Sequence, residues 1–159
     1  MSTERVIVQR GASKALMEAL TTIGQKIRPG TTANDHIPPL ITEGSAERIV
    51  GLVKDAKSRG GDIILGDIQH KKAYIKPHIV VGVEPGWPLW EQESFGPVLG
   101  LKVVDTEEEA IALANMTDYS LMGSVWTNDL EKALRVARQV RAGTCTVTCH
   151  RSKGNDNSI

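Results

Sequence analysis

Short apolar runs alternate with longer amphipathic segments along most of the chain. Apolar runs of about four to eight residues bounded by turn residues are typical of strands, whereas apolar positions that recur every three or four residues are typical of helices. The first pattern predicts strands over residues 5–9, 62–65, 98–104, 121–127 and 144–148, with one or two more over 73–83. Strands that alternate with helices favour an α/β fold with a largely parallel sheet flanked by helices.

Four amphipathic segments predict helices, the first of them over residues 13–26. Residues that cap helix starts precede them: Ser13, either Thr42 or Ser45, Thr106 with Glu109, and Asn128 with Glu131. Glycines end three of the segments, at Gly30, at Gly60 with Gly61, and at Gly143. We expect buried stripes formed by Leu16, Leu20, Ile23 and Ile27, by Ile49, Leu52, Val53 and Ala56, and by Leu130, Ala133, Leu134, Ala137 and Val140.

The composition is that of a globular protein, and its length of 159 residues suits one domain or part of one. Nineteen basic residues balance nineteen acidic ones, which argues against nucleic acid or an anionic membrane as the main partner. No apolar run approaches the ~20 residues that span a bilayer, and the start has no secretory signal pattern. With only two cysteines the chain has no disulfide framework, so we expect a cytoplasmic location.

Two cysteines and a histidine near the end of the chain could act as a thiol nucleophile or as half a metal site. Cys145 falls on a predicted buried strand, whereas Cys149 and His150 begin a polar tail over 149–159 that we expect to be disordered. We therefore predict no catalytic residue and no metal site. We expect the three other histidines to be solvated and assign them no role: His36, His70 and His78.

The segment Trp90 to Val98, which reads WEQESFGPV, differs from ordinary core and ordinary loop. Gly96 and Pro97 break regular structure and predict a rigid turn that presents Glu93 and Phe95. A carboxylate accepts hydrogen bonds from sugar hydroxyls, and an aromatic ring packs against a planar group. The pattern therefore indicates a ligand with both features, although a surface turn with solvated acids and a half-buried Phe fits it too.

The residues Glu93-x-Phe95-Gly96-Pro97-Val98 resemble a signature of the NAD(P)-dependent aldehyde dehydrogenase superfamily. Further segments resemble the family in the same order: Pro39-Leu-Ile41 with Gly61 and Gly66, Tyr74 to Val83, Ala114-Asn115-x-Thr117-x-Tyr119, and Leu130 to Gly143. The resemblance covers residues 1–148 and is strongest to fungal relatives of the salicylaldehyde and vanillin enzymes. It implies a partial aldehyde dehydrogenase catalytic domain over these residues.

This resemblance implies oxidation of a small-molecule aldehyde to a carboxylic acid, with NAD or NADP as the cofactor. In the family reaction a cysteine thiolate attacks the carbonyl, and hydride passes to the nicotinamide. Glu93 matches the family carboxylate that holds the ribose hydroxyls beside the nicotinamide. Phe95 matches the ring that lies next to the nicotinamide, so both are expected cofactor-binding residues.

The family's catalytic residues have no match in this chain. The family cysteine sits in a G-Q-x-C segment that is followed directly by residues like Met1 to Arg5, and the dinucleotide-binding domain lies further upstream. Smaller departures are Pro38 and Asp67, which stand where the family has glycines, and the divergence after Thr148. Three hypotheses follow: a family member that is inactive alone, a fragment of a longer active enzyme, or a non-catalytic protein that docks on a full-length relative.

Overall fold

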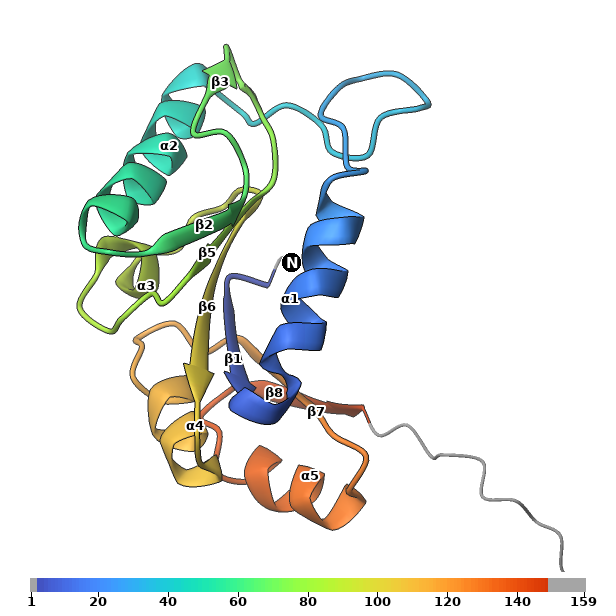
Figure 1. Ribbon diagram of the computed structural model, residues 1–159, viewed down its shortest axis with the longest axis vertical. Helices are drawn as coiled ribbons and strands as arrows, with labels where there is room; N and C mark the ends of the chain where they lie inside the picture. The colour runs from blue at the N-terminus through green and yellow to red at the C-terminus, as the bar shows by residue number, and fades with distance from the viewer. Residues whose placement is uncertain (1–2, 149–159) are drawn as a thin grey trace, which may run out of the picture. The chain divides into compact units, whose positions relative to one another are not determined.

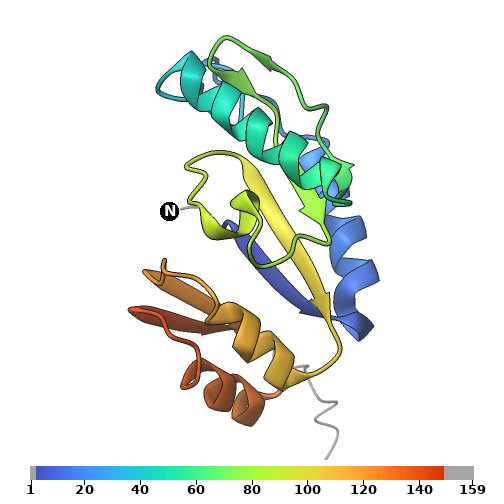
Figure 2. The same ribbon diagram turned by 90° about the vertical axis from the view of Figure 1, so that its left-hand side faces the viewer.

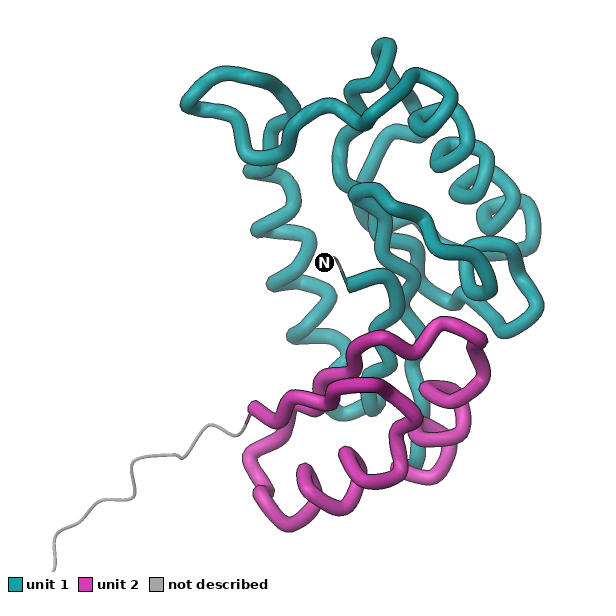
Figure 3. The backbone as a smooth tube through the Cα atoms, turned by 180° about the vertical axis from the view of Figure 1, so that it is seen from behind, with its two compact units in different colours: residues 1–106 teal, residues 107–159 magenta. Residues whose placement is uncertain are grey.

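The computed structural model describes residues 3–148, which form parts of two compact units. Unit 1 comprises Met1–Thr106 and unit 2 comprises Glu107–Ile159, coloured teal and magenta in Figure 3. The predicted domain boundaries, with one partial domain over 1–148, stay a prediction. The predicted disorder of 149–159 concerns residues outside those that the structure describes.

Unit 1 is organised around a four-stranded sheet of mixed direction. Its central strand β6 (Val98–Val104) pairs in parallel with β1 on one side and with β5 on the other, and β2 joins the far edge of β5 in the antiparallel direction. The strand order is therefore β1 (Arg5–Gln9), β6, β5 (His78–Val81), β2 (Asp62–Leu65). This arrangement confirms the predicted α/β fold with a largely parallel sheet.

Helices cover both faces of this sheet. Helix α1 (Arg10–Gly24) lies on one side, and α2 (Glu43–Ser58) with the short α3 (Pro88–Glu91) lies on the other, as Figures 1 and 2 show. The predicted strand region 73–83 contains two strands, β4 (Tyr74–Ile75) and β5, and β4 pairs with β3 (His70–Lys71) in a small hairpin. We did not predict α3 or β3, because both are too short to show a hydrophobic period.

Helix α2 supplies a large part of the core of unit 1. The Thr42 hydroxyl accepts a hydrogen bond from the Ser45 backbone N–H at 3.1 Å, so Thr42 rather than Ser45 caps the helix. All four residues of the predicted stripe are buried, which confirms the prediction: Ile49, Leu52, Val53 and Ala56. Burying a large aliphatic side chain stabilises the fold by about 1.5–3 kcal/mol, so this face anchors the helix.

Helix α1 differs from its prediction in its start and in its buried face. It begins at Arg10 without a side-chain cap, and the Ser13 hydroxyl donates to the Arg10 carbonyl inside the helix at 2.8 Å, so the predicted cap at Ser13 is wrong. Ile23 is exposed, whereas Gly24 is buried against β2. A Cβ at Gly24 would lie 2.2 Å from Cδ2 of Leu65. This close approach of helix and strand turns Ile23 away from the core.

Unit 2 contains a β-α-β arrangement preceded by a helix. Strand β7 (Met122–Trp126) pairs in parallel with β8 (Thr144–Thr148), and α5 (Leu130–Ala137) connects them after α4 (Glu107–Ala114). These elements confirm the predicted strands and the positions of both helices. The predicted capping box at Thr106 and Glu109 stays a prediction.

Two details of α5 correct the sequence-based expectation. Asp129, not Asn128, caps the helix, because its carboxylate accepts a hydrogen bond from the Lys132 N–H at 3.0 Å. Of the predicted buried stripe Ala133 is fully buried, but Leu130 and Leu134 are 55% and 44% exposed. The helical period shows that the leucines share a face, but it does not show what covers that face.

Polar contacts tie the elements of unit 2 together. The Asn115 amide donates to the Gln139 carbonyl at 2.9 Å, and its oxygen accepts from the Arg141 N–H at 2.7 Å. Arg135 on α5 makes a two-pronged ion pair with Glu107 on α4, with both N–O distances at 2.9 Å. Hydrogen bonding to Arg135 lowers the pKa of Glu107. The Asn115 contacts join the end of α4 to the residues that follow α5, and the ion pair joins the start of α4 to α5.

His78, which we expected to be solvated, is buried at the start of β5 and is only 1% exposed. Its Nε2 accepts a hydrogen bond from the Ile68 N–H at 3.0 Å, and its Nδ1 lies 2.8 Å from the Lys76 carbonyl. Because Nε2 accepts, the proton of the neutral ring is on Nδ1 and points to Lys76. Burial is the main cause that lowers the pKa of His78. The histidine is therefore a neutral linker between the β2–β3 loop and β5.

We predict that His78 makes the protein less stable in mild acid. The lowered pKa means that the unfolded chain binds a proton more readily than the folded one, so stability falls as pH drops below the unfolded value of about 6.5. The loss approaches ~1.4 kcal/mol per pH unit at most, since one proton is involved. Urea unfolding at pH 7.5 and 5.5 measures it. His78→Gln should reduce this dependence, whereas His36→Gln, at an exposed histidine, should retain it; equal slopes in both variants would contradict the prediction.

Candidate functional site

The turn over residues 93–97 connects the end of α3 to the start of β6. Phe95 has a φ of 51°, in the left-handed region that bulky residues rarely adopt, and its side chain is 78% exposed. Glu93 is half-buried, and its carboxylate has no hydrogen-bond partner among residues 3–148. The turn therefore presents an aromatic ring and a carboxylate that its own fold does not use. We call this segment the 93–97 turn.

Glu4, which directly precedes β1, holds the backbone of this turn. One oxygen of its carboxylate accepts three hydrogen bonds, from the Ser94 N–H at 2.8 Å, the Ser94 hydroxyl at 2.9 Å and the Phe95 N–H at 3.1 Å. Hydrogen bonds to an ionised acceptor are about twice as strong as those between neutral groups. Glu4 therefore fixes the backbone N–H groups of Ser94 and Phe95.

Arg48 holds the same turn through its carbonyl groups, and Arg5 holds the helix that precedes it. The guanidinium of Arg48, on α2, donates to the Glu93 carbonyl at 3.3 Å and to the Ser94 carbonyl at 2.5 Å. Arg5, on β1, donates to the carbonyl of Trp90 at 2.9 Å. A carboxylate thus binds the N–H groups of the turn, and a guanidinium binds its C=O groups. In regular structure, backbone polar groups bond to the backbone of a neighbouring strand or helical turn. In this turn, charged side chains take the place of those partners.

Gly96 brings the turn into direct contact with α2. A Cβ at Gly96 would lie 2.0 Å from Cδ1 of Ile49, which is fully buried. The carbonyl of the next residue, Pro97, accepts a hydrogen bond from the His78 N–H at 2.8 Å, in register with the pairing of β5 and β6. The turn is therefore fixed to the helix on one side and to the sheet on the other.

The sequence predicted the residues that the turn presents but not those that hold it. Glu93 and Phe95 lie in the predicted turn, two residues apart and beside the predicted breakers. Glu4 and Arg48 were missed because each contacts the turn from a different element, 90 and 46 positions away in the chain. A local pattern carries no signal for such a contact. In the structure, Glu4 and Arg48 are recognised as anchors because each is a charged side chain that bonds to backbone groups of the turn.

The remaining candidates from the sequence do not form a second site in the described part of the chain. Cys145 lies half-buried on β8, and burial raises the pKa of its thiol, which disfavours the reactive thiolate. Cys149 and His150 lie outside the described residues. Within residues 3–148 no three His, Cys, Asp or Glu side chains come together in a way that could hold a metal ion. No helix in that range is long and apolar enough to cross a membrane.

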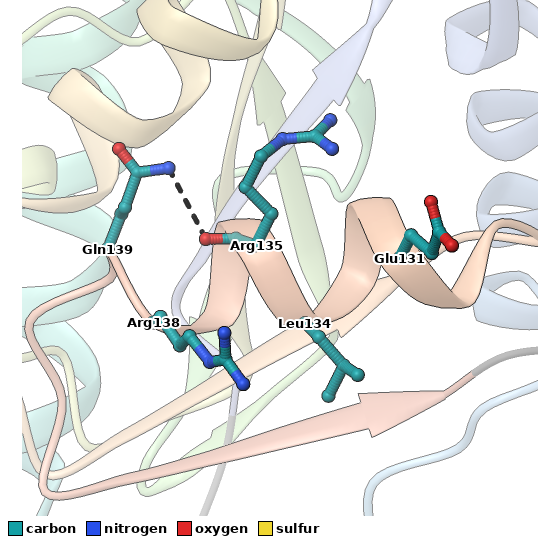
Figure 4. A pocket seen from close by; sticks show the side chains of 5 residues that line it. All are labelled: Glu131, Leu134, Arg135, Arg138 and Gln139. Carbon is teal, nitrogen blue, oxygen red and sulfur yellow. Dashed lines mark hydrogen bonds between the residues drawn. The ribbon is translucent and has the colours of Figure 1, made fainter.

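An open hollow of about 450 Å³ lies along α5 in unit 2 (Figure 4). It is lined by Glu131, Leu134, Arg135, Arg138 and Gln139, all from this helix or the two residues after it. The Gln139 amide donates to the Arg135 carbonyl at 3.3 Å, and the Arg135 guanidinium is bound to Glu107. The hollow therefore lies along one helix and gathers no reactive groups.

We predict that Gly96→Ala destabilises the protein by about 1–3 kcal/mol, because the new methyl group overpacks against Ile49. Ile49→Val removes the clashing Cδ1 and alone costs about 0.5–1.5 kcal/mol. The double variant should lose less stability than the two single losses added together. Urea unfolding followed by circular dichroism measures all three free energies.

Gly51→Ala is the matched control for this prediction. Gly51 lies in α2, two residues from Ile49, and a Cβ there would meet nothing within 4 Å. This variant should be neutral or more stable by up to ~1 kcal/mol, since Ala favours a helix over Gly. A Gly96→Ala protein as stable as the Gly51→Ala protein, or strictly additive losses, would contradict the proposed contact.

Comparison with known proteins finds relatives of this chain in sequence and in fold. Residues 1–158 match the family model described as "Aldehyde dehydrogenase family". A betaine aldehyde dehydrogenase of Cereibacter sphaeroides is 33% identical over 150 residues, which cover 92% of this chain and 31% of that protein. This chain therefore spans about a third of the length of the curated relatives that it matches. The finer similarity to the fungal salicylaldehyde and vanillin enzymes stays a prediction.

Solved structures agree with the match in sequence. An NAD-dependent aldehyde dehydrogenase from Sinorhizobium meliloti is 34% identical, with a TM-score of 0.85 over 94% of this chain and 30% of that one. A point mutant of betaine aldehyde dehydrogenase from Staphylococcus aureus, solved in complex with NAD+, is 28% identical, with a TM-score of 0.83 over 94% of this chain and 32% of that one. The sequence match and the shared fold lead to one conclusion: the chain belongs to the aldehyde dehydrogenase family.

Proposed function

We propose that this chain serves the NAD(P)-dependent oxidation of an aldehyde to a carboxylic acid by contacting the nicotinamide half of the cofactor. The observation that carries the proposal is the 93–97 turn, which holds an exposed aromatic ring and an unpartnered carboxylate on a backbone fixed by charged side chains. Family membership supports it, as does the relative that was solved with NAD+.

The two presented side chains fit the two parts of a nicotinamide riboside. The Glu93 carboxylate has two oxygens that accept hydrogen bonds, which suits the neighbouring hydroxyls of a ribose. The exposed Phe95 ring offers a flat apolar face against which a nicotinamide ring can pack. The cofactor, when bound, accepts the hydride of the oxidation. The residues of this chain orient it and keep water from one face of its ring.

The thiolate that attacks the aldehyde comes from outside the residues that the structure describes. Cys145 is the one cysteine among residues 3–148, and burial raises the pKa of its thiol, so the thiolate population at neutral pH is small. We therefore propose that residues 3–148 contribute cofactor contact but no nucleophile. Cys149 follows Thr148, where the sequence diverges from the family, so we propose no role for it. The proposed nucleophile belongs to a longer form of this protein or to a full-length relative on which the chain docks.

Contact with the nicotinamide can be tested on the chain alone by saturation-transfer NMR with nicotinamide mononucleotide. We expect saturation of the protein to reach the nicotinamide and ribose protons at millimolar ligand, because two side chains support only weak binding. Phe95→Ala should remove transfer to the nicotinamide ring. Glu93→Gln should weaken transfer to the ribose at least about threefold, since it loses the charge that strengthens hydrogen bonds.

Two variants and one ligand serve as controls for this experiment. Trp126→Ala removes another exposed aromatic ring, and Glu47→Gln neutralises another exposed carboxylate, so both should behave as the wild type. Adenosine monophosphate, which lacks the nicotinamide, should receive less saturation than nicotinamide mononucleotide. A folded chain that transfers nothing to nicotinamide mononucleotide, or Phe95→Ala and Glu93→Gln variants that transfer as much as the wild type, would overturn the proposed contact.

The proposal also predicts no turnover by the purified 159-residue chain. With NAD+ or NADP+ and a panel of aromatic and aliphatic aldehydes, absorbance at the NADH band should rise no faster than it does without the protein. Circular dichroism on the same sample shows that the chain is folded. Any protein-dependent turnover would contradict the prediction; its loss in Cys145→Ser would assign the nucleophile to β8, and its loss in Cys149→Ser would assign it to Cys149.

A further inference from the structure

We propose that Glu4 is a positioning residue for the cofactor: its carboxylate holds the 93–97 turn in the conformation that presents Phe95 and Glu93. Arg48 acts with it from the opposite side of the backbone. This inference rests on the proposed function, because it assigns a role toward the same ligand. It adds two residues that touch neither the nicotinamide nor the aldehyde.

The hydrogen bonds of Glu4 converge on one point. Three donors from two consecutive residues, Ser94 and Phe95, meet a single carboxylate oxygen at 2.8–3.1 Å. Two successive N–H groups can face one oxygen only while the intervening peptide keeps a bent conformation. The anion therefore selects one backbone shape among those open to the turn. A hydroxyl or amide at this position would accept the same bonds with about half the strength.

The turn needs this anchor because the side chain of Phe95 does not stabilise the turn. Phe95 has a φ of 51° and a ring that is 78% exposed, so the left-handed backbone is not stabilised by burial of the ring. Non-glycine residues keep such a conformation only where surrounding contacts impose it. The contacts that reach the Phe95 backbone N–H come from Glu4. Glu4 therefore stabilises the strained backbone conformation of Phe95.

Both anchors are themselves fixed by regular structure. The Glu4 carbonyl accepts a hydrogen bond from the Gly100 N–H at 2.8 Å, which extends the pairing of β1 with β6. Arg48 lies on α2 next to Ile49, whose side chain contacts Gly96. An N–H anchor on the sheet and a C=O anchor on the helix thus hold the two sides of the same peptides. The position of the cofactor ring is in this way set by the packing of α2 on the sheet.

Amide hydrogen exchange, read residue by residue by NMR, tests the anchor without any ligand. In Glu4→Ala the Ser94 and Phe95 amides should exchange at least about tenfold faster, while amides of β5 and α2 keep their rates. Glu4→Gln should recover part of the protection, since its carbonyl oxygen still accepts. Ser94→Ala, which removes one of the three bonds, should give a smaller effect. Glu47→Ala, at an exposed carboxylate of α2, should match the wild type.

Saturation transfer to nicotinamide mononucleotide then tests the role toward the cofactor. Transfer to the nicotinamide ring should fall at least about fivefold in Glu4→Ala, recover partly in Glu4→Gln and stay unchanged in Glu47→Ala. Arg48→Ala should lower it as well. Recovery in Glu4→Gln separates a positioning role from general destabilisation, and unfolding free energies of the same variants check this.

The possible failures are distinct. Wild-type exchange at Ser94 and Phe95 in Glu4→Ala, or an equal rise in exchange throughout unit 1, would overturn the anchor itself. Faster exchange at these two amides with undiminished transfer to the nicotinamide would overturn the positioning role. If the wild type shows no transfer at all, the proposed function fails, and the positioning role toward the cofactor fails with it, while the exchange result still establishes the hold of Glu4 on the turn.

Discussion

Three donors that converge on one oxygen of Glu4 are the constraint on which the candidate site depends. They fix a turn whose aromatic residue is exposed and conformationally strained, and which therefore cannot fix itself. The turn leads directly into β6, the central strand of the sheet, and its Gly96 leaves room for Ile49 of α2. The same few contacts that order the site thus join the first strand, the second helix and the sheet.

The two units are stabilised in different ways. Most of the buried apolar side chains of the described residues lie in unit 1, many of them on α2 and β5. In unit 2 few side chains are fully buried, and Asn115, Arg141 and the Glu107–Arg135 pair join its elements instead. Exposed hydrogen bonds and ion pairs contribute less than apolar burial, about 1 kcal/mol or less for a surface pair. We therefore expect unit 1 to dominate the stability of the chain.

The features of unit 1 support the proposed cofactor contact but supply no thiol for covalent chemistry. A ring, a carboxylate and a backbone held by ionic side chains are suited to orient a flat ligand that carries a sugar. None of these groups is a thiol, and the cysteine on β8 is disfavoured as a nucleophile because burial raises the pKa of its thiol. The chain belongs to the aldehyde dehydrogenase family, and in the proposed function positioning the nicotinamide and attacking the carbonyl fall to different parts of the protein.

The sequence by itself determined the features that depend on near neighbours. The strands, the buried face of α2 and the turn at Gly96-Pro97 follow from periods and breakers within about ten residues of each other. Tertiary structure decided what depends on contacts between distant segments. The close approach of Gly24 to Leu65 set which face of α1 is buried, packing around β5 buried His78, and Leu130 and Leu134 stayed exposed although their spacing is helical. Glu4 reaches a turn 90 residues away, and no local pattern encodes such a contact, because it exists only once β1 has paired with β6.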